Sequence, residues 1–324
     1  MFSVVIPLYN KSGYIGKCLK SVFDQTFQDF EIIVVNDGST DDSLEKVQNL
    51  AAVGVHPITI HCQTNAGVST ARNMGVKTAH FEFIAFLDAD DWWEPTYLQE
   101  MKILIWKFPE AVIFGSNYFD VKNDIKKKAE IAVEQEFSSG LIDYCRVYAN
   151  NLNMPLWTGA TIIRKTIFEL EKGFNPKLKL GEDFDLWIRI ALNYPVAFLN
   201  KHLANYNQDV DLAGRAVGNL QKPDAHILWN LEYLADEELT NRDLKQLIDN
   251  LRIYDLFPYF LNKDYHELAR KELNKVDWSK QPISAKLRYN MPLFVLMMIY
   301  KVQQQGSKMK QFFLRSLSKS KTRI

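Results

Sequence analysis

Hydrophobic and polar positions alternate along the first two hundred residues in blocks that predict strands and helices in turn. Short apolar runs bounded by polar turns are typical of buried strands, and apolar residues three and four apart are typical of helices that face a core. The predicted strands span 2–8, 30–35, 58–62, 81–87, 111–119, 156–164 and 196–206. The predicted helices span 13–27, 41–52, 69–79, 95–108 and 182–194. This alternation predicts an α/β fold with a doubly wound, mostly parallel sheet.

The pattern changes after the last predicted strand, and from about residue 223 it predicts helices only. The stretch 123–137 is charged and irregular, which is typical of a loop or an insertion. The chain has 324 residues, of which 47% are hydrophobic and 24% charged, so it can bury a large core. We therefore expect two domains, an α/β domain over 1–222 and a helical region with a basic, amphipathic tail over 223–324.

Charge is distributed unevenly, although the whole chain is neutral. No Asp or Glu follows Asp277, whereas ten Lys or Arg residues do, which leaves 29 basic against 39 acidic residues before that point. Within this basic stretch, residues 286–317 also carry large apolar side chains. Two interpretations stay open: a helix that lies in an anionic membrane interface, or a helix that packs on the body with a solvated basic face.

Neither the cysteines nor the first residues of the sequence indicate secretion of the protein. Cys18, Cys62 and Cys145 are widely spaced, so we expect neither a disulfide framework nor a metal-binding pair. No apolar run approaches the roughly 18 residues of a spanning helix, and the first residues lack the basic start of a secretory signal. The expected location is cytoplasmic, with peripheral contact at the inner face of the plasma membrane if the basic tail binds lipid.

Polar side chains follow three of the predicted strands at the point where each strand ends. Tyr9 follows the first strand, Asp37 the second, and Asp88 and Asp90 the fourth. Because ligands of doubly wound sheets bind at the carboxyl ends of the strands, we expect one pocket there. Two carboxylates in an Asp-x-Asp turn can hold a divalent cation together with phosphate oxygens. The plainer interpretation is a solvated turn in which Asp91 caps the next helix.

The turn after the second strand is also open to two interpretations. Asp37 can accept a hydrogen bond from a nucleotide base, and Gly38 lets the backbone approach a ligand closely. Alternatively, the segment is an ordinary strand-to-helix turn in which Ser39 or Thr40 caps the helix.

Two helix starts add candidate residues. Ser69 is placed to cap the helix 69–79, and Arg72 lies in its first turn, where a cation opposes the helix dipole. That placement indicates an anionic partner, either a phosphate or the acidic turn. Asp183, at the start of helix 182–194, can act as a general base on an acceptor hydroxyl. Helix capping is the alternative explanation for Asp183, since acids favour helix N-termini.

Five segments together carry a resemblance to a known family. They are Val4–Asn10, Val35–Asp41, Asn65–Asn73, Phe86–Asp91 and Gly181–Asp183. Their order resembles that of family 2 glycosyltransferases with the GT-A fold, over residues 2–206. The resemblance implies inverting transfer from a nucleotide sugar, most often a UDP-sugar, with Mn²⁺ or Mg²⁺ as cofactor. We expect the acceptor to be a hydroxyl of a glycan or of a lipid-linked sugar, in the assembly of cell-surface polysaccharide.

The same resemblance implies roles for the matching positions. The residues that would bind the nucleotide and donor are Pro7, Tyr9, Asn10, Asp37, Arg72, Asp88 and Ala89. Asp88 and Asp90 would hold the metal, and Asp183 would be the catalytic base. The residues that would shape the acceptor side are Trp157, Thr158, Gly159, Glu182 and Trp187.

Two departures from the family pattern matter. Residues 206–209 read Tyr-Asn-Gln-Asp, without the His that family members often carry there, so the sequence leaves open which group completes the metal site from that side. No Gln-x-x-Arg-Trp follows Asp183, and this motif marks the processive synthases of the superfamily. The sequence therefore favours an enzyme that adds a single sugar.

Two alternative functions remain open. A sugar-phosphate nucleotidyltransferase would carry a Gly-rich, basic loop after the first strand, and residues 9–13 are too short and too poor in Gly for that. A catalytically silent subunit that binds nucleotide sugars is disfavoured by the intact Asp88, Asp90 and Asp183. No nucleic-acid partner is expected.

Overall fold

The computed structural model describes residues 1–53, 56–210 and 220–300, and all structural statements below refer to these ranges. Contacts divide the chain into two compact units, Met1–Leu247 and Ile248–Ile324. This division lies later than the expected boundary at 222/223, because residues 223–247 pack with the first unit. Part of the predicted basic tail, 301–324, lies outside the described residues.

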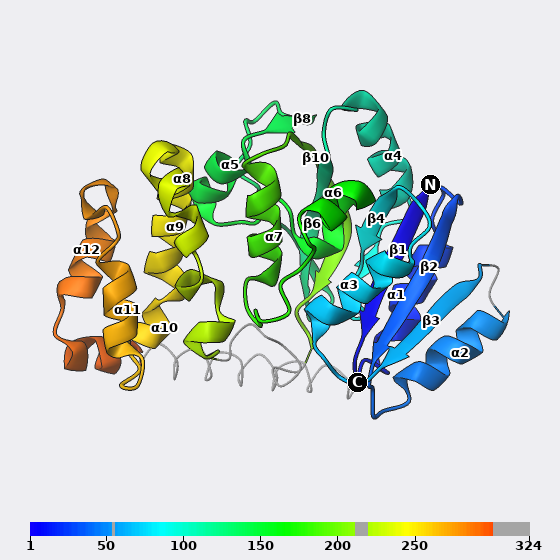
Figure 1. Ribbon diagram of the computed structural model, residues 1–324, viewed down its shortest axis with the longest axis horizontal. Helices are drawn as coiled ribbons and strands as arrows, with labels where there is room; N and C mark the ends of the chain where they lie inside the picture. The colour runs from blue at the N-terminus through cyan, green and yellow to red at the C-terminus, as the bar shows by residue number, and fades with distance from the viewer. Residues whose placement is uncertain (54–55, 211–219, 301–324) are drawn as a thin grey trace, which may run out of the picture. The chain divides into compact units, whose positions relative to one another are not determined.

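The first unit is built on a sheet that has ten strands within the described residues, in the order β3-β2-β1-β4-β9-β6-β10-β5, with β7 beside β6 and β8 beside β10 (Figure 1). The strands are β1 Phe2–Leu8, β2 Phe30–Asp37, β3 Ile58–Gln63, β4 Phe83–Phe86, β5 Trp92–Trp93, β6 Ile113–Lys122, β7 Ile125–Lys128, β8 Ser139–Ile142, β9 Thr161–Arg164 and β10 Val196–Asn207. Strands β1 to β4 are mutually parallel, as predicted. Strand β9 runs antiparallel between β4 and β6, so the second half of the sheet is mixed.

Helices cover the sheet and supply its connections. Those of the sheet region are α1 Ile15–Phe23, α2 Ser43–Val53, α3 Val68–Thr78, α4 Tyr97–Lys107, α5 Tyr144–Asn151, α6 Lys165–Leu170 and α7 Glu182–Ala191. Figure 1 shows α3 and α7 on the same side of the sheet. All seven residues of β1 are buried, as expected of a strand that is covered on both faces. Helix α3 packs directly on β1, since a Cβ at Gly75 would lie 2.4 Å from Val5 Cγ1. This close packing fixes the start of α3 beside the strand ends.

The charged stretch 123–137 is not wholly irregular, which corrects the sequence prediction. Its first part, β7, pairs antiparallel with β6, and Lys122 lies opposite Ile125. Asn123 and Asp124 form the two-residue turn with φ of 49° and 61°. Two consecutive residues with positive φ are typical of a tight hairpin, and Asn and Asp tolerate that conformation.

Beyond β10 the described chain is helical, as predicted. Its elements are 3-10 turns at Pro223–Ala225, Ile227–Trp229, Glu232–Leu234 and Trp278–Lys280, and helices α8 Ala235–Thr240, α9 Arg242–Asp255, α10 Phe257–Phe260, α11 His266–Leu273 and α12 Ile283–Asn290. No helix in the described part of the chain has the length and apolarity needed to cross a bilayer.

The segment after residue 222 supports the start of α7. Lys179 N–H donates to the Ala225 carbonyl (2.8 Å), and Ile227 N–H donates to the Leu180 carbonyl (3.1 Å). Gly181, the N-cap of α7, has a φ of 81°, which only glycine adopts easily. A Cβ at Gly181 would lie 2.2 Å from Ile227 Cγ2. The loop that precedes Glu182 and Asp183 is therefore held in place by Ala225 and Ile227.

Gly181→Ala is expected to lower the free energy of unfolding by roughly 2–5 kcal/mol, because a left-handed backbone cost adds to an overpacking cost. Urea denaturation followed by circular dichroism measures this loss. Gly67→Ala is the matched control, since Gly67 has a φ of 91° but nothing within 4 Å of the added Cβ. Gly67→Ala should lose about 1–3 kcal/mol, because its φ of 91° and ψ of 161° lie in a region that glycine alone favours. A loss in Gly181→Ala that is no larger than the loss in Gly67→Ala would show that the Ile227 contact is unimportant.

Candidate active site

A cavity of about 490 Å³ lies at the carboxyl ends of β1, β2 and β4 in the first unit. Its size is in the range of small-molecule and cofactor sites. The residues that line it are Pro7, Leu8, Tyr9, Lys11, Asp37, Asn65, Ala66, Gly67, Val68, Ser69, Ala71, Arg72, Asp88, Ala89, Asp90, Pro176, Leu178, Lys179 and Glu182. The structure thus brings the predicted strand-end residues together with the segment that precedes α7.

Arg72 lies at the centre of this arrangement. Its guanidinium donates to Asp88 Oδ1 (2.8 Å) and to Glu182 Oε1 (3.1 Å). Its side chain is only 4% exposed. Burial alone would lower the pKa of Arg72, but the two carboxylates raise it above its ordinary value. Of the two anionic partners that the sequence indicates for Arg72, the structure shows the acidic turn. Arg72 also contacts Glu182, which lies 110 residues after it in the chain.

Lys11 is a site residue that the sequence analysis missed. Its Nζ lies 2.7 Å from Asp90 Oδ2, and both side chains are largely buried. The only local signal is a basic residue in the turn that follows β1. Together, Lys11 and Arg72 give each carboxylate of the Asp-x-Asp turn a cation from the chain itself.

The two carboxylates of the Asp-x-Asp turn suit a divalent ion that the protein holds only in part. No group of three or more His, Cys, Asp or Glu that could hold a metal occurs among the described residues. Asp88 and Asp90 supply two oxygen ligands, and Mg²⁺ is commonly held by one or two carboxylates plus substrate phosphates. The donor set therefore fits an ion that shares its coordination with a diphosphate rather than an ion caged by protein alone.

Asp91 has a different task from the predicted one. It is 2% exposed, and its Oδ1 accepts a hydrogen bond from the Asn207 N–H (2.7 Å). Burial and the neighbouring carboxylates raise the pKa of Asp91. Helix α4 has Thr96 at its N-cap, so Asp91 does not cap it. Asp91 instead holds the end of β10 in place through Asn207. Asn207 belongs to residues 206–209, the segment that lacks the His of the family pattern.

Asp183 and Glu182 begin α7 side by side. Asp183 Oδ1 accepts from the Phe184 N–H (2.7 Å), and its Oδ2 accepts a long hydrogen bond from Thr158 Oγ1 (3.4 Å). Burial raises the pKa of Asp183. Burial and the charge of Asp183 raise the pKa of Glu182 to about 7. Because Glu182 shares Arg72 with Asp88, the candidate base lies on the same side of the molecule as the Asp-x-Asp turn.

Asp37 organises the loop that starts α3. It accepts hydrogen bonds from Gln63 Nε2 (2.7 Å), Ala66 N–H (2.8 Å) and Gly67 N–H (2.9 Å). Asn10 is not among the residues that line the cavity. Its Oδ1 accepts from the Thr40 N–H (2.8 Å), so it joins the turns after β1 and β2. Both residues shape the rim of the cavity through the backbone.

Ser69 does not cap α3, because Gly67 occupies the N-cap position. The Ser69 side chain is buried, and its Oγ has no hydrogen-bond partner among the described residues. Ser69 also lines the cavity, but its Oγ is covered by neighbouring atoms, so a ligand reaches this hydroxyl only if they move.

The acceptor-side residues divide into two groups. Trp187 is fully buried and packs edge-on against Phe174 (ring centroids 5.6 Å apart), so it belongs to the core and not to a binding surface. Gly159 is fixed by a hydrogen bond from Trp93 Nε1 to its carbonyl (2.7 Å). The Trp157 ring packs against Tyr206 (5.2 Å). The other two members of the predicted set contact the charged residues of the site, Thr158 through Asp183 and Glu182 through Arg72.

The site and the sheet define an α/β protein with an acid-lined and cation-lined cavity at its strand ends. The chain belongs to glycosyl transferase family 2, whose sequence profile matches residues 3–170. It is 31% identical over 290 residues to the glycosyltransferase GlyG of Streptococcus pneumoniae, covering 84% of this chain and 92% of that protein. These findings confirm the family that the five motifs indicate.

Other relatives match only in part. The glycosyltransferase GlyA of Streptococcus pneumoniae is 38% identical over 116 residues, which are 36% of this chain and 16% of that protein. The chain also spans about a third or less of the length of several further curated relatives that it matches.

The fold is that of solved transferase structures. TarS 1–349 of S. aureus, in complex with UDP-GlcNAc, superposes with a TM-score of 0.69 at 21% identity, covering 85% of this chain and 79% of that one. This similarity confirms the predicted GT-A type of α/β fold with helices at the C-terminal end.

Arg72→Gln is expected to destabilise the protein by roughly 3–5 kcal/mol near pH 8, because it leaves buried carboxylates unpaired. The loss should shrink towards pH 5. A carboxyl whose pKa is raised in the folded state stabilises at low pH, and this contribution is lost as the pH rises through the folded pKa. For Glu182 that window runs from its ordinary 4.5 to about 7, and loss of Arg72 extends it upward. Urea denaturation at several pH values measures the effect.

The exposed pair Lys20–Asp24 provides the control for Arg72. Lys20→Gln should change the free energy of unfolding by less than about 0.5 kcal/mol at every pH. A flat pH profile for Arg72→Gln would contradict the central role of this arginine.

Proposed function

We propose that this protein is an inverting glycosyltransferase that moves a sugar from a nucleotide diphosphate donor, a UDP-sugar, to a hydroxyl of a glycan or lipid-linked acceptor. One observation carries the proposal: Arg72 joins Asp88, at the end of β4, to Glu182, which stands next to Asp183. Acids from distant segments thereby meet at a single cavity. The UDP-GlcNAc complex of the similar TarS fold supports a UDP-linked donor.

The donor would lie along the strand ends. Pro7, Tyr9, Asp37 and Ala89 form the wall for the nucleoside. Asp37 already accepts three hydrogen bonds, and a carboxylate has about four acceptor positions, so one remains for a base N–H.

The diphosphate would face the cations of the cavity. Lys11, Arg72 and Lys179 line it, and the N-terminus of α3 adds its partial positive charge. These groups favour the charge that builds up on the leaving nucleoside diphosphate.

Asp88 and Asp90 would hold Mn²⁺ or Mg²⁺ together with the diphosphate. The ion would supply Lewis-acid assistance to the leaving group. Lys11 occupies the Asp90 carboxylate in the structure, and a bound diphosphate would offer its ammonium group a new anionic partner.

Asp183 would act as the base. The acceptor hydroxyl oxygen forms a bond to the anomeric carbon from the face opposite the diphosphate, its proton passes to the Asp183 carboxylate, and the bond to the diphosphate oxygen breaks. The upward shift of the Asp183 pKa strengthens it as a proton acceptor. Thr158 orients the carboxylate through its hydroxyl. The absence of the processive motif supports single addition, in the assembly of a surface glycan.

We further propose peripheral contact with an anionic membrane, at the inner face of the plasma membrane. Four apolar side chains are each more than half exposed, Ile283 and Leu287 one turn apart on α12 and Phe294 and Met298 after the end of this helix. Lys286 and Arg288 stand between them in sequence. Exposed apolar side chains with interspersed cations favour binding to an anionic lipid surface.

Asp183→Asn and Asp90→Ala should separate chemistry from donor binding. In wild type, UDP with Mn²⁺ should raise the thermal unfolding midpoint. Asp183→Asn should keep that shift but lose at least about 100-fold in transfer or donor hydrolysis, since it removes the base. Asp90→Ala should lose both the shift and the activity. Equal shifts in wild type and Asp90→Ala would refute the metal assignment, and a wild type without activity would favour a silent subunit.

Leu287→Ser with Phe294→Ser should weaken flotation with vesicles that contain phosphatidylglycerol by about tenfold or more, because two exposed apolar anchors are removed. Vesicles of phosphatidylcholine alone should bind wild type weakly. Leu239→Ser, at an exposed leucine of α8, is the matched control and should float as wild type does. Unchanged flotation of the double variant would rule out this surface as the membrane contact.

A further inference from the structure

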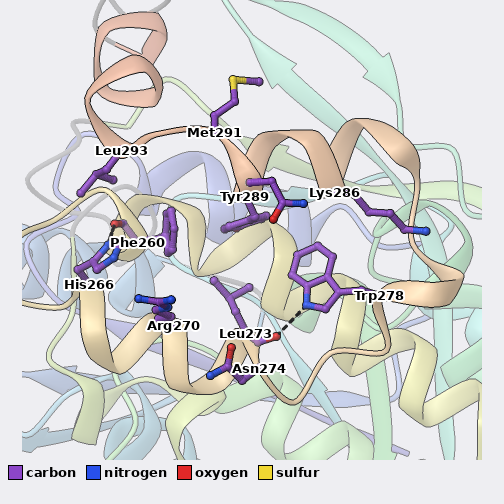
Figure 2. Close-up of a pocket in the computed structure, with 11 residues that line it drawn as sticks. Phe260, His266, Arg270, Leu273, Asn274, Trp278, Lys286, Tyr289, Met291 and Leu293 are labelled. Atoms are coloured by element: carbon purple, nitrogen blue, oxygen red, sulfur yellow. Dashed lines mark hydrogen bonds between the residues drawn. The ribbon is translucent and has the colours of Figure 1, made fainter.

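A second cavity lies wholly within the unit Ile248–Ile324, apart from the residues of the candidate active site. Its volume is about 450 Å³, and α11, the turn Trp278–Lys280 and α12 enclose it. Three aromatic rings form a row along it, Phe260, Tyr289 and Trp278 (Figure 2). The ring centroids are 5.0 Å apart for Phe260 and Tyr289 and 5.5 Å apart for Tyr289 and Trp278.

The polar atoms of these rings are already used by the protein. Tyr289 Oη donates to the Ile253 carbonyl (2.6 Å), and Trp278 Nε1 donates to the Leu273 carbonyl (3.2 Å). The His266 ring lies tilted against the Phe260 ring, and its Nδ1 lies 2.6 Å from the Phe260 carbonyl oxygen. The rings are thereby held in place, and their carbon surfaces line the cavity.

A cation stands at each end of the aromatic row (Figure 2). Arg270 lies one turn beyond His266 on α11 and is exposed, without an ion pair to any carboxylate in the described ranges. Lys286 lies at the Trp278 end, where its Nζ donates to the Ser279 carbonyl (3.3 Å). Asn274 and Asn290 add amide groups to the lining.

No Asp or Glu is among the residues that line this cavity. Two nearby acids of the unit have lysine partners, and the charge of a third, Asp255, acts on the Tyr289 hydroxyl. Glu272 pairs with Lys275 (2.7 Å), and Asp277 pairs with Lys280 (3.0 Å). The positive charge at the cavity is therefore not neutralised by its own walls, which favours an anionic ligand.

We propose that this cavity binds a saccharide that carries a carboxylate or phosphate group. The C–H face of a sugar ring packs against aromatic carbon, which the row of three rings provides. Arg270 offers a planar fork that suits carboxylate and phosphate oxygens, and Lys286 offers a second charge at the opposite end. The two amides can bond to sugar hydroxyls. A lipid chain would instead require a continuous apolar channel, without polar groups at both ends.

This binding needs neither donor nor turnover, so it stands apart from the proposed transfer reaction. It gives the second unit a task of its own, the capture of an anionic glycan.

Isothermal titration of the full-length protein tests the proposal. The probes are a tetrasaccharide of alternating glucuronate and N-acetylglucosamine, its carboxyl-reduced form, and glucose 6-phosphate beside glucose. We expect the uronate or the phosphate probe to bind at least about tenfold more tightly than its neutral match, since a charged hydrogen-bonded pair is lost in the neutral form. The arm that binds identifies which anionic group the cavity prefers.

The double variant Arg270→Gln with Lys286→Gln should weaken that binding by about tenfold or more. Lys271→Gln, an exposed neighbour of Arg270 outside the cavity lining, is the matched control and should stay within about twofold. Thermal unfolding checks that the variants are folded.

Several outcomes would overturn the proposal. No binding of either anionic probe would do so, as would equal binding of the neutral forms or unchanged binding in the double variant. None of these results depends on whether Asp183 acts as a base.

Discussion

The ion-pair bridge from Arg72 to Asp88 and Glu182 is the interaction on which the rest of the site depends. It links the end of a central strand to the start of α7 through one buried guanidinium. Without that cation, burial of several carboxylates in one small volume would be opposed by their mutual repulsion and by desolvation. The bridge therefore allows the acids to be concentrated where a diphosphate and an acceptor hydroxyl would meet.

The acidic segment at the start of α7 is also supported by residues that follow the last strand of the sheet. Residues 223–234 pair with the loop before Gly181 and place the Tyr233 hydroxyl 2.9 Å from Asp185 Oδ1. Asp185 Oδ2 also accepts a hydrogen bond from Arg189 Nη2 (3.0 Å). This part of the chain thus belongs to the active-site unit in structure, although its hydrophobic pattern is that of the helical region. A domain boundary set by pattern alone separates it from the segment that it holds.

Much of the fold could be predicted from local pattern, and the failures have physical reasons. The strand Phe2–Leu8 is recognisable from its continuous apolar run. The Asp-x-Asp turn is recognisable from its place directly after the buried strand β4. Pattern does not report the direction of pairing, so the strand 156–164 was predicted but the antiparallel direction of β9 within it was not. Lys11 was missed because its partner, Asp90, is 79 residues away and only the fold brings them together. Trp187 was placed at the acceptor side by helical spacing, but its neighbours bury it.

The positive charges that face the acidic turn have a consequence for how the protein folds. Because Lys11 and Arg72 already balance the acidic turn, the polypeptide can reach its native form without waiting for any ion. Newly made chains then do not depend on the supply of metal to escape degradation. In the proposed mechanism, scarcity of the ion would slow turnover while leaving the amount of folded protein unchanged.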